Sequence, residues 1–161
     1  MRPAEPAASP PHLRDHDVER RASQATLEAL AGEEHHRCLL CGAANDLGLG
    51  LRFSVQPDGS VLARFACSDT FQSYPETLHG GVISALLDAA MTNALFAVGI
   101  VGLTAELSVR FLAPVVLNQD ALVRAVIERD CDPLYYLRAG LEQHGQLMAR
   151  ATAKFLDKSF L

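Results

Sequence analysis

The sequence has no surplus of positive charge. It contains 14 lysines and arginines against 19 aspartates and glutamates, a formal net charge of −5. No local cluster of basic residues offsets this balance, and a surface that binds nucleic acid needs one. DNA and RNA are therefore not expected partners.

Cysteines and uninterrupted apolar runs are also scarce. Four cysteines in 161 residues are too few for a disulfide scaffold, so we expect reduced thiols in a cytoplasmic protein. The first 14 residues lack the apolar core of a secretory signal, which favours the same location. The most apolar run, residues 82–103, is interrupted by polar residues and by Asp88, so no membrane span is expected.

The length and composition indicate one domain with an N-terminal extension. Domains hold roughly 150 residues, and 49% hydrophobic with 20% charged residues is typical of a globular chain. The proline-rich residues 1–14 are predicted to form a flexible tail, and residues 15–34 an amphipathic helix. Its apolar stripe is mostly alanine (Val18, Ala22, Ala25 and Ala29), so we expect weak docking. The predicted division is 1–34, the extension, and 35–161, the domain.

The rest of the chain is predicted to be strands around one helix. Alternation of period two predicts a hairpin of residues 47–56 and 61–67, and later strands at 105–111, 121–129, 134–142 and 146–156. Residues 80–98 are apolar on every side, which is typical of a buried helix. We therefore predict an α+β fold, with an antiparallel sheet of five to six strands and a short N-terminal helical appendage.

A glycine pair opens the predicted buried helix. The first N–H groups of a helix have no helical partner and lie at the positive end of its dipole. Gly80 and Gly81 would leave these donors uncovered, so that a substrate carbonyl could approach and a developing oxyanion could be stabilised. The alternative is that both glycines only permit tight packing of the helix on the sheet.

A single carboxylate lies within the same helix. Asp88 follows Leu86 and Leu87, and aspartate is a poor residue for a helix interior. A carboxylate in apolar surroundings is costly unless it is hydrogen-bonded, and such groups often mark functional sites. Asp88 is therefore a candidate nucleophile or general base. The alternative is a narrow polar edge shared with Ser84 and Thr92, four residues to either side.

These residues resemble a known family. His-Gly-Gly at 79–81, followed by Asp88 and by the strand segment 104–114, resembles the hotdog-fold thioesterases of the PaaI-like (phenylacetyl-CoA type) branch. The segment 38–49, which contains Cys-x-x-Cys-Gly, is similar to the N-terminal part of one subgroup. The resemblance covers about residues 38–157.

The resemblance implies a hotdog fold and hydrolysis of acyl-CoA or aryl-CoA thioesters without a cofactor. By position, the Gly80 N–H would polarise the thioester carbonyl, and Asp88 would be the nucleophile or general base. His79 would shape the helix start, and Thr104 would position water or Asp88. For His79 and Thr104, plain packing at the helix start and an ordinary strand threonine are the alternatives.

The substrate-binding residues are less specific. Gly81 belongs to the helix start, and Arg110 and Phe111 belong to the strand that resembles the family. Some members carry an asparagine six residues before the histidine, where this chain has Ser73, and Gln72 is a possible substitute. Arg110 is a candidate contact for the phosphates of CoA, although strand arginines usually face solvent.

The distance between the two main site residues predicts a shared active site. At 1.5 Å per residue, Gly80 and Asp88 lie ~12 Å apart along the helix axis. A two-fold axis would bring Asp88 of a second copy to Gly80, so we expect at least a homodimer. The resemblance also allows a homotetramer.

Two other activities and a metal site are the alternatives to this prediction. A hotdog dehydratase or hydratase could use His79 and Asp88 as an acid/base pair, and a non-catalytic protein could bind acyl-CoA. The segment 35–41, with the sequence His-His-Arg-Cys-Leu-Leu-Cys, superficially resembles half a zinc site. A closed structural zinc needs four ligands and no second Cys-x-x-Cys is present, so we expect packing rather than metal binding.

Overall fold

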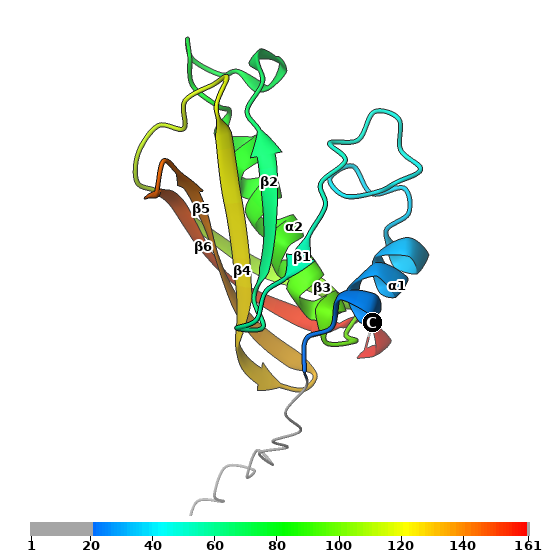
Figure 1. The fold of residues 1–161 in the computed structure, drawn as a ribbon. Coiled ribbons are helices and arrows are strands. Elements are labelled where there is room, and N and C mark those ends of the chain that lie inside the picture. The colour runs from blue at the N-terminus through cyan, green and yellow to red at the C-terminus, as the bar shows by residue number, and fades with distance from the viewer. Residues whose placement is uncertain (1–20, 161) are drawn as a thin grey trace, which may run out of the picture.

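The computed structural model describes residues 21–160 and has one curved sheet that wraps around a long helix (Figure 1). The predicted tail 1–14 and residues 15–20 of the first predicted helix lie outside the described residues. In chain order the elements are α1 (Gln24–Glu34), β1 (Ser54–Val55), β2 (Val61–Ala66), the 3-10 turn η1 (Asp69–Phe71), α2 (Gly80–Ala97), β3 (Gly102–Phe111), β4 (Asp120–Cys131), β5 (Leu134–Gln143), β6 (Gln146–Asp157) and the 3-10 turn η2 (Lys158–Phe160).

All six strands form one antiparallel sheet in the order β1-β2-β4-β5-β6-β3. Tight turns at 132–133 and 144–145 join β4, β5 and β6 into a meander, and these strands lie where strands 121–129, 134–142 and 146–156 were predicted. β3 returns from α2 to the far side of β6, so it forms the edge opposite β1. This arrangement confirms the α+β hotdog architecture.

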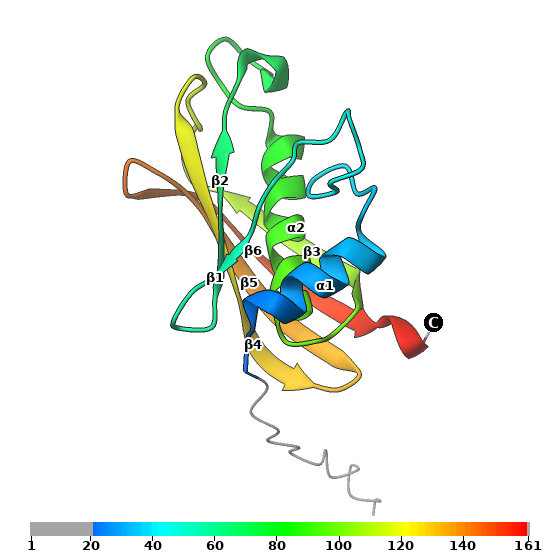
Figure 2. The same ribbon diagram turned by 45° about the vertical axis from the view of Figure 1, so that its right-hand side comes forward.

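The helix α2 lies along the concave face of the sheet (Figure 2). Twelve of its eighteen residues are buried, which confirms the prediction of a buried helix. α2 is also long and apolar enough to pass a length-and-composition test for a membrane span. However, 67% of that segment is buried within the protein, and the core helix of a soluble protein passes the same test.

The first helix is shorter than predicted and uses a different face. Ser23 caps it through a contact with the Thr26 N–H, and the Ser23 N–H donates to the Ala97 carbonyl at the end of α2. The predicted alanine stripe is wrong at Ala25 and Ala29, which are exposed, whereas Leu27 is 4% exposed. Ala22 packs against the core, and Val18 lies outside the described residues. Leucine removes more apolar area from water than alanine, and this decides which face docks. The division at residue 34 stays a prediction.

We expect Leu27→Ala to lower the free energy of unfolding by about 2–5 kcal/mol, the usual range for truncation of a buried leucine. The reason is that Leu27 is the fully buried contact of α1. Denaturant unfolding measures the change. Leu47→Ala is the matched control, because Leu47 is 88% exposed and should change stability by less than about 0.5 kcal/mol. Equal small effects for both variants would show that α1 does not dock in solution.

The predicted strand over 47–56 is mostly wrong. Only Ser54 and Val55 pair with β2. Before them, the N–H groups of Leu49 and Leu51 donate to the carbonyls of residues 39 and 40, so this segment pairs with the loop after α1. Leu51 and Phe53 are buried, whereas Leu47 is 88% exposed, so the period-two alternation reports burial correctly only over the second half of the segment. It does not report which backbone the segment pairs with.

Candidate active site

The start of α2 is capped by a histidine. His79 precedes the helix with an extended backbone, and its Nδ1 accepts a hydrogen bond of 2.9 Å from the Gly81 N–H. Nδ1 is unprotonated in this contact, so a neutral imidazole carries its proton on Nε2. His79 therefore has the structural role of an N-cap, and its other ring nitrogen stays available at the exposed helix start.

The two glycines differ in what surrounds them. A Cβ at Gly81 would lie 3.0 Å from the His79 Nδ1, so a side chain there would crowd the cap. A Cβ at Gly80 would lie 3.4 Å from the Phe111 ring, which is ordinary contact distance. Within residues 21–160, no hydrogen-bond acceptor faces the Gly80 N–H. Gly81 thus serves the cap, and Gly80 presents a backbone donor beside an aromatic ring.

Asp88 is half-buried near the middle of α2, and a residue of the sheet holds its carboxylate in place. Its Oδ1 accepts a hydrogen bond of 2.7 Å from the Thr104 hydroxyl on β3. The hydroxyls of Ser84 and Thr92 donate instead to backbone carbonyls four residues earlier, Gly80 and Asp88. The polar-edge alternative therefore does not account for the carboxylate, because neither hydroxyl bonds to it.

A β-bulge sets the position of Thr104. The pairing of β3 with β6 shifts register between Thr104 and Glu106. Bulges of this kind re-aim a side chain relative to the rest of the strand. Thr104 is opposite Phe155, which is fully buried, so both lie on the helix side of the sheet. The irregularity thus allows β3 to direct the Thr104 hydroxyl to α2.

The four predicted catalytic residues and the predicted substrate-binding residue Phe111 form two groups within one chain. His79, Gly80 and Phe111 lie at the start of α2, and Asp88 with Thr104 lies two turns further along. The helix rise separates Gly80 from Asp88 by ~12 Å along the axis. A single chain therefore does not bring the Gly80 N–H and the Asp88 carboxylate to one reacting atom.

Gln72 and Ser73 lie in the loop that leads into α2. The Gln72 Oε1 accepts from the Glu76 N–H at 3.3 Å, and the Ser73 hydroxyl donates to the Thr77 carbonyl at 3.3 Å. Both side chains are exposed. They stabilise the loop that holds the helix start, and the amide nitrogen of Gln72 remains able to donate to a ligand.

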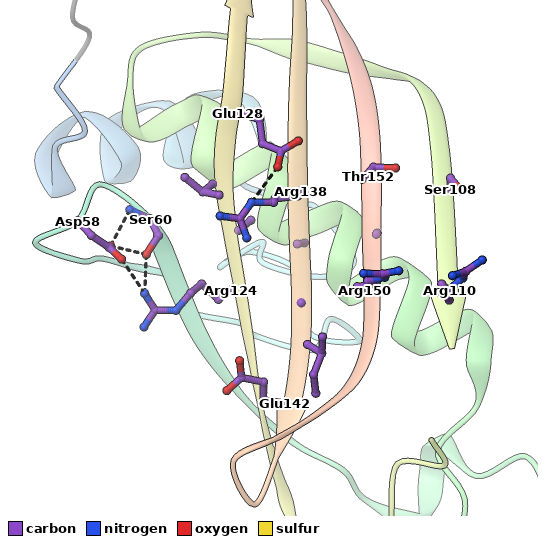
Figure 3. Close-up of a pocket in the computed structure, with 16 residues that line it drawn as sticks. Asp58, Ser60, Ser108, Arg110, Arg124, Glu128, Arg138, Glu142, Arg150 and Thr152 are labelled. Carbon is purple, nitrogen blue, oxygen red and sulfur yellow. Dashed lines mark hydrogen bonds and ion pairs between the residues drawn. The ribbon is translucent and has the colours of Figure 1, made fainter. Parts of the chain in front are cut away.

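Arg110 lies on the face of the sheet away from α2 (Figure 3). It lines a groove of about 830 Å³ and is directly opposite Arg150 in the pairing of β3 with β6. Two other arginines of this groove form ion pairs, Arg124 with Asp58 and Arg138 with Glu128. Within residues 21–160, Arg110 and Arg150 have no such partner, and Glu142 is the acidic residue of the groove that is likewise outside any ion pair.

Burial changes the protonation of groups beside α2. It lowers the pKa of His35, although the negative charges of Glu34 and Asp88 act in the opposite direction. Burial also raises the pKa of the Cys41 thiol to about 11 and that of Cys67 to about 11. At neutral pH the imidazole and both thiols are therefore mainly neutral in the free protein.

Asn93 is a polar residue of α2 that the sequence did not single out. Asn93 is 1% exposed, and its amide donates to the Ala89 carbonyl at 2.8 Å and contacts the Cys41 sulfur at 3.8 Å. The signal was present, because an amide in the most apolar part of a helix needs a partner. The partner itself, 52 residues away, could not be inferred from spacing.

Comparisons with known proteins find similarity to thioesterases. Residues 76–129 match the model of the thioesterase superfamily, and this stretch includes α2 and β3. No curated protein sequence matches significantly. These findings agree with the six-stranded hotdog fold, and the resemblance to hotdog-fold PaaI-like thioesterases is confirmed.

Three solved structures illustrate the likeness. One is a thioesterase superfamily protein at 24% identity and a TM-score of 0.69; the match covers 73% of this chain and 61% of that one. This chain thus spans less than two thirds of that protein. The second is a phenylacetic acid degradation-related protein of Ralstonia eutropha JMP134, described as a candidate thioesterase (26% identity, TM-score 0.62, 80% and 89% covered). The third is a hypothetical thioesterase of Streptococcus pneumoniae TIGR4 with coenzyme A (17%, 0.63, 67% and 88%).

Proposed function

We propose that this protein hydrolyses acyl-CoA or aryl-CoA thioesters to the free acid and CoA. The observation that carries the proposal is the Asp88 carboxylate, held by Thr104 on a helix whose first N–H has no partner among residues 21–160. Membership of the matched region in the thioesterase superfamily and the CoA-bound neighbour support the substrate class. The acyl group and the choice between CoA and a carrier protein are left open.

The proposed reaction uses one backbone hydrogen-bond donor and one carboxylate. The Gly80 N–H donates to the thioester carbonyl oxygen and stabilises the negative charge that develops there. Asp88 either attacks the carbonyl carbon or removes a proton from the water that attacks it. The carbon–sulfur bond then breaks, and the CoA thiolate leaves and takes up a proton. If Asp88 is the nucleophile, water then hydrolyses the bond between the acyl group and the carboxylate, which releases the acid and restores Asp88. If Asp88 is the base, the acid forms directly and the proton taken from water passes to the thiolate. Phe111 forms one wall beside the carbonyl, and His79 keeps the helix start in place.

We further propose that two chains complete each site. β3 is an edge strand, and its apolar side chains Leu103, Leu107 and Phe111 are 48%, 37% and 52% exposed. An unpaired edge with exposed apolar residues favours association with another chain. If β3 pairs antiparallel with its own copy about a two-fold axis near its middle, the Thr104 end of one strand lies beside the Phe111 end of the other. Asp88 of one chain then approaches Gly80 of the other.

Arg110 extends the proposal to the CoA end of the substrate. Its guanidinium lies beside Arg150, has no ion-pair partner within the part of the chain that the structure describes, and has the charge and donor geometry that phosphate groups require. The groove lies on the opposite face of the sheet from α2, so we assign Arg110 to the nucleotide phosphates and not to the acyl group.

We expect the purified full-length protein to release free thiol from at least one short, medium or aromatic acyl-CoA. A panel of such substrates with a thiol-reactive dye measures the release. Water addition to an enoyl-CoA without thiol release would instead identify a hydratase. Binding of acyl-CoA with no turnover across the panel would contradict hydrolysis and favour a non-catalytic binding protein.

We expect Thr104→Ala to lower turnover by about 10-fold, because the hydroxyl positions Asp88 without reacting itself. Steady-state kinetics on the best substrate would measure the change. Thr104→Ser is the matched control, since it keeps the hydroxyl and should restore most of the activity. Equal loss in both variants would show that the hydrogen bond is not what matters at this position.

A further inference from the structure

We propose that His35, Cys38 and Cys41 bind one divalent metal ion of the zinc class, with a fourth coordination position open to solvent or an external ligand. The imidazole nitrogen and the two sulfurs all lie within 4.8 Å of one another. Over residues 21–160 no fourth histidine, cysteine or carboxylate joins this group. The ligand-count argument from the sequence excludes a closed four-ligand site, and it does not exclude an open one with three protein ligands.

The separations suit coordination of a single ion. The His35 Nδ1 lies 3.7 Å from the Cys41 Sγ. Zinc binds nitrogen at ~2.0–2.1 Å and sulfur at ~2.3 Å, so two ligand atoms on one tetrahedral ion are roughly 3.5–3.8 Å apart. The observed spacing is already that of two ligands on a common metal. Only small side-chain rotations are needed to bring the third ligand atom to the same spacing.

The backbone of this segment holds the three ligands on one side. The Cys38 N–H donates to the His35 carbonyl and the Gly42 N–H donates to the Cys38 carbonyl, both at 2.9 Å. A Cβ at Gly42 would lie 2.4 Å from the backbone nitrogen of Cys38, so another residue there would force the turn open. Two consecutive turns therefore present residues 35, 38 and 41 at regular three-residue spacing.

The surroundings of the ligands are those of a supported metal site. The Leu40 N–H lies 3.4 Å from the Cys38 Sγ, and the Asn93 amide lies 3.8 Å from the Cys41 Sγ. Such donors stabilise sulfur that carries negative charge. The Phe96 ring meets the His35 ring edge-on at 4.8 Å, which fixes the orientation of the imidazole. Asn93 and Phe96 both belong to α2, so the core helix supports the cluster from one side.

The chemistry of the three ligands selects the metal class. Two thiolates and one imidazole are soft and borderline donors, which favour zinc over calcium or magnesium. Two thiolates also balance a divalent charge, so the bound assembly is neutral and suits a half-buried place. A cavity of about 640 Å³, lined in part by Cys41 and Asn93, lies beside the cluster. A metal here would fasten the loop after α1 to α2.

The test is metal binding by the full-length protein, measured without reference to activity. Metal is removed from reduced protein with a chelator, and zinc is then titrated in competition with a chromophoric chelator. We expect one zinc per chain and a higher melting temperature when zinc is present. Cobalt substitution should add thiolate-to-metal charge-transfer absorption. Cys38→Ser and His35→Asn should each weaken zinc binding by at least ~100-fold.

Two matched variants serve as controls. His36→Asn changes the neighbouring exposed histidine, and Cys131→Ser removes a cysteine outside the cluster. Both should bind zinc as the wild type does. Circular dichroism establishes that each variant is folded. Failure of the folded, reduced wild type to bind zinc would overturn the proposal, as would unchanged binding in both ligand variants. A Cys38–Cys41 disulfide that forms readily while zinc does not bind would identify a redox pair instead.

Discussion

Replacing Asp88 by asparagine is expected to abolish most thioester hydrolysis in a protein that still folds. Asparagine has nearly the same shape, and its side-chain oxygen can still accept the hydrogen bond from Thr104. It is neither a useful base nor a nucleophile. General-base catalysis contributes roughly 10²–10⁴-fold, so a loss of turnover of that order or more is expected.

The control for this variant is Asp46→Asn, an equal change at an exposed loop position. Steady-state turnover of both proteins on the same acyl-CoA, with circular dichroism and melting temperature, separates chemistry from folding. Near wild-type turnover by Asp88→Asn would show that the carboxylate is structural and that another group acts on the thioester. A similar loss in Asp46→Asn would show that the assay reports general damage.

Mixing two inactive variants is expected to restore activity if the site is shared between chains. Asp88→Asn chains keep the uncovered Gly80 donor. Gly80→Val chains keep the carboxylate and the backbone N–H, but the branched side chain beside Phe111 covers that N–H and blocks the substrate carbonyl. A mixed dimer then holds one intact site and one doubly damaged site. Random pairing of equal amounts should therefore recover roughly a quarter of wild-type activity. Each variant alone should remain inactive.

Subunit exchange must be demonstrated in the same sample, and native mass spectrometry with one isotope-labelled variant does so. Asp88→Asn mixed with Thr104→Ala is the matched comparison. Both of these residues act from the same chain, so one site of their mixed dimer lacks the Asp88 carboxylate and the other lacks the Thr104 hydroxyl. No site is intact, and mixing should therefore give no recovery beyond the average of the two variants. Exchange with no recovery in the Gly80→Val mixture would contradict a shared site and would require completion of the site within one chain.

The sequence predicted most of the fold because burial follows local periodicity. Residues 80–98 are apolar on all sides, and the structure buries them as α2 within one residue of the predicted end. The three strands after residue 120 could be predicted equally well, because the turns at 132–133 and 144–145 interrupt clear alternation. Residues 47–56 alternate just as clearly but have few strand partners, because pairing depends on which backbone is adjacent.

The sequence predicted which residues form the candidate site, but it did not predict the contacts between them. The sequence singled out Asp88 because a carboxylate in an apolar helix needs a partner. It left open whether Ser84 and Thr92 provide one, and the structure gives the contact to Thr104 on another element. Likewise, the sequence could not separate the two glycines. Their surroundings do so, since Gly81 lies against the His79 ring and Gly80 beside Phe111.

What the sequence determined by itself is the α+β class, the buried helix and its glycine start. These depend on local propensity and on the free energy of burying apolar side chains, which residue order encodes directly. Only the tertiary structure decided that Leu27 docks α1, that β3 is the edge strand, and that His35 joins Cys38 and Cys41. Each of these depends on distances between segments, and the path of the intervening chain sets those distances.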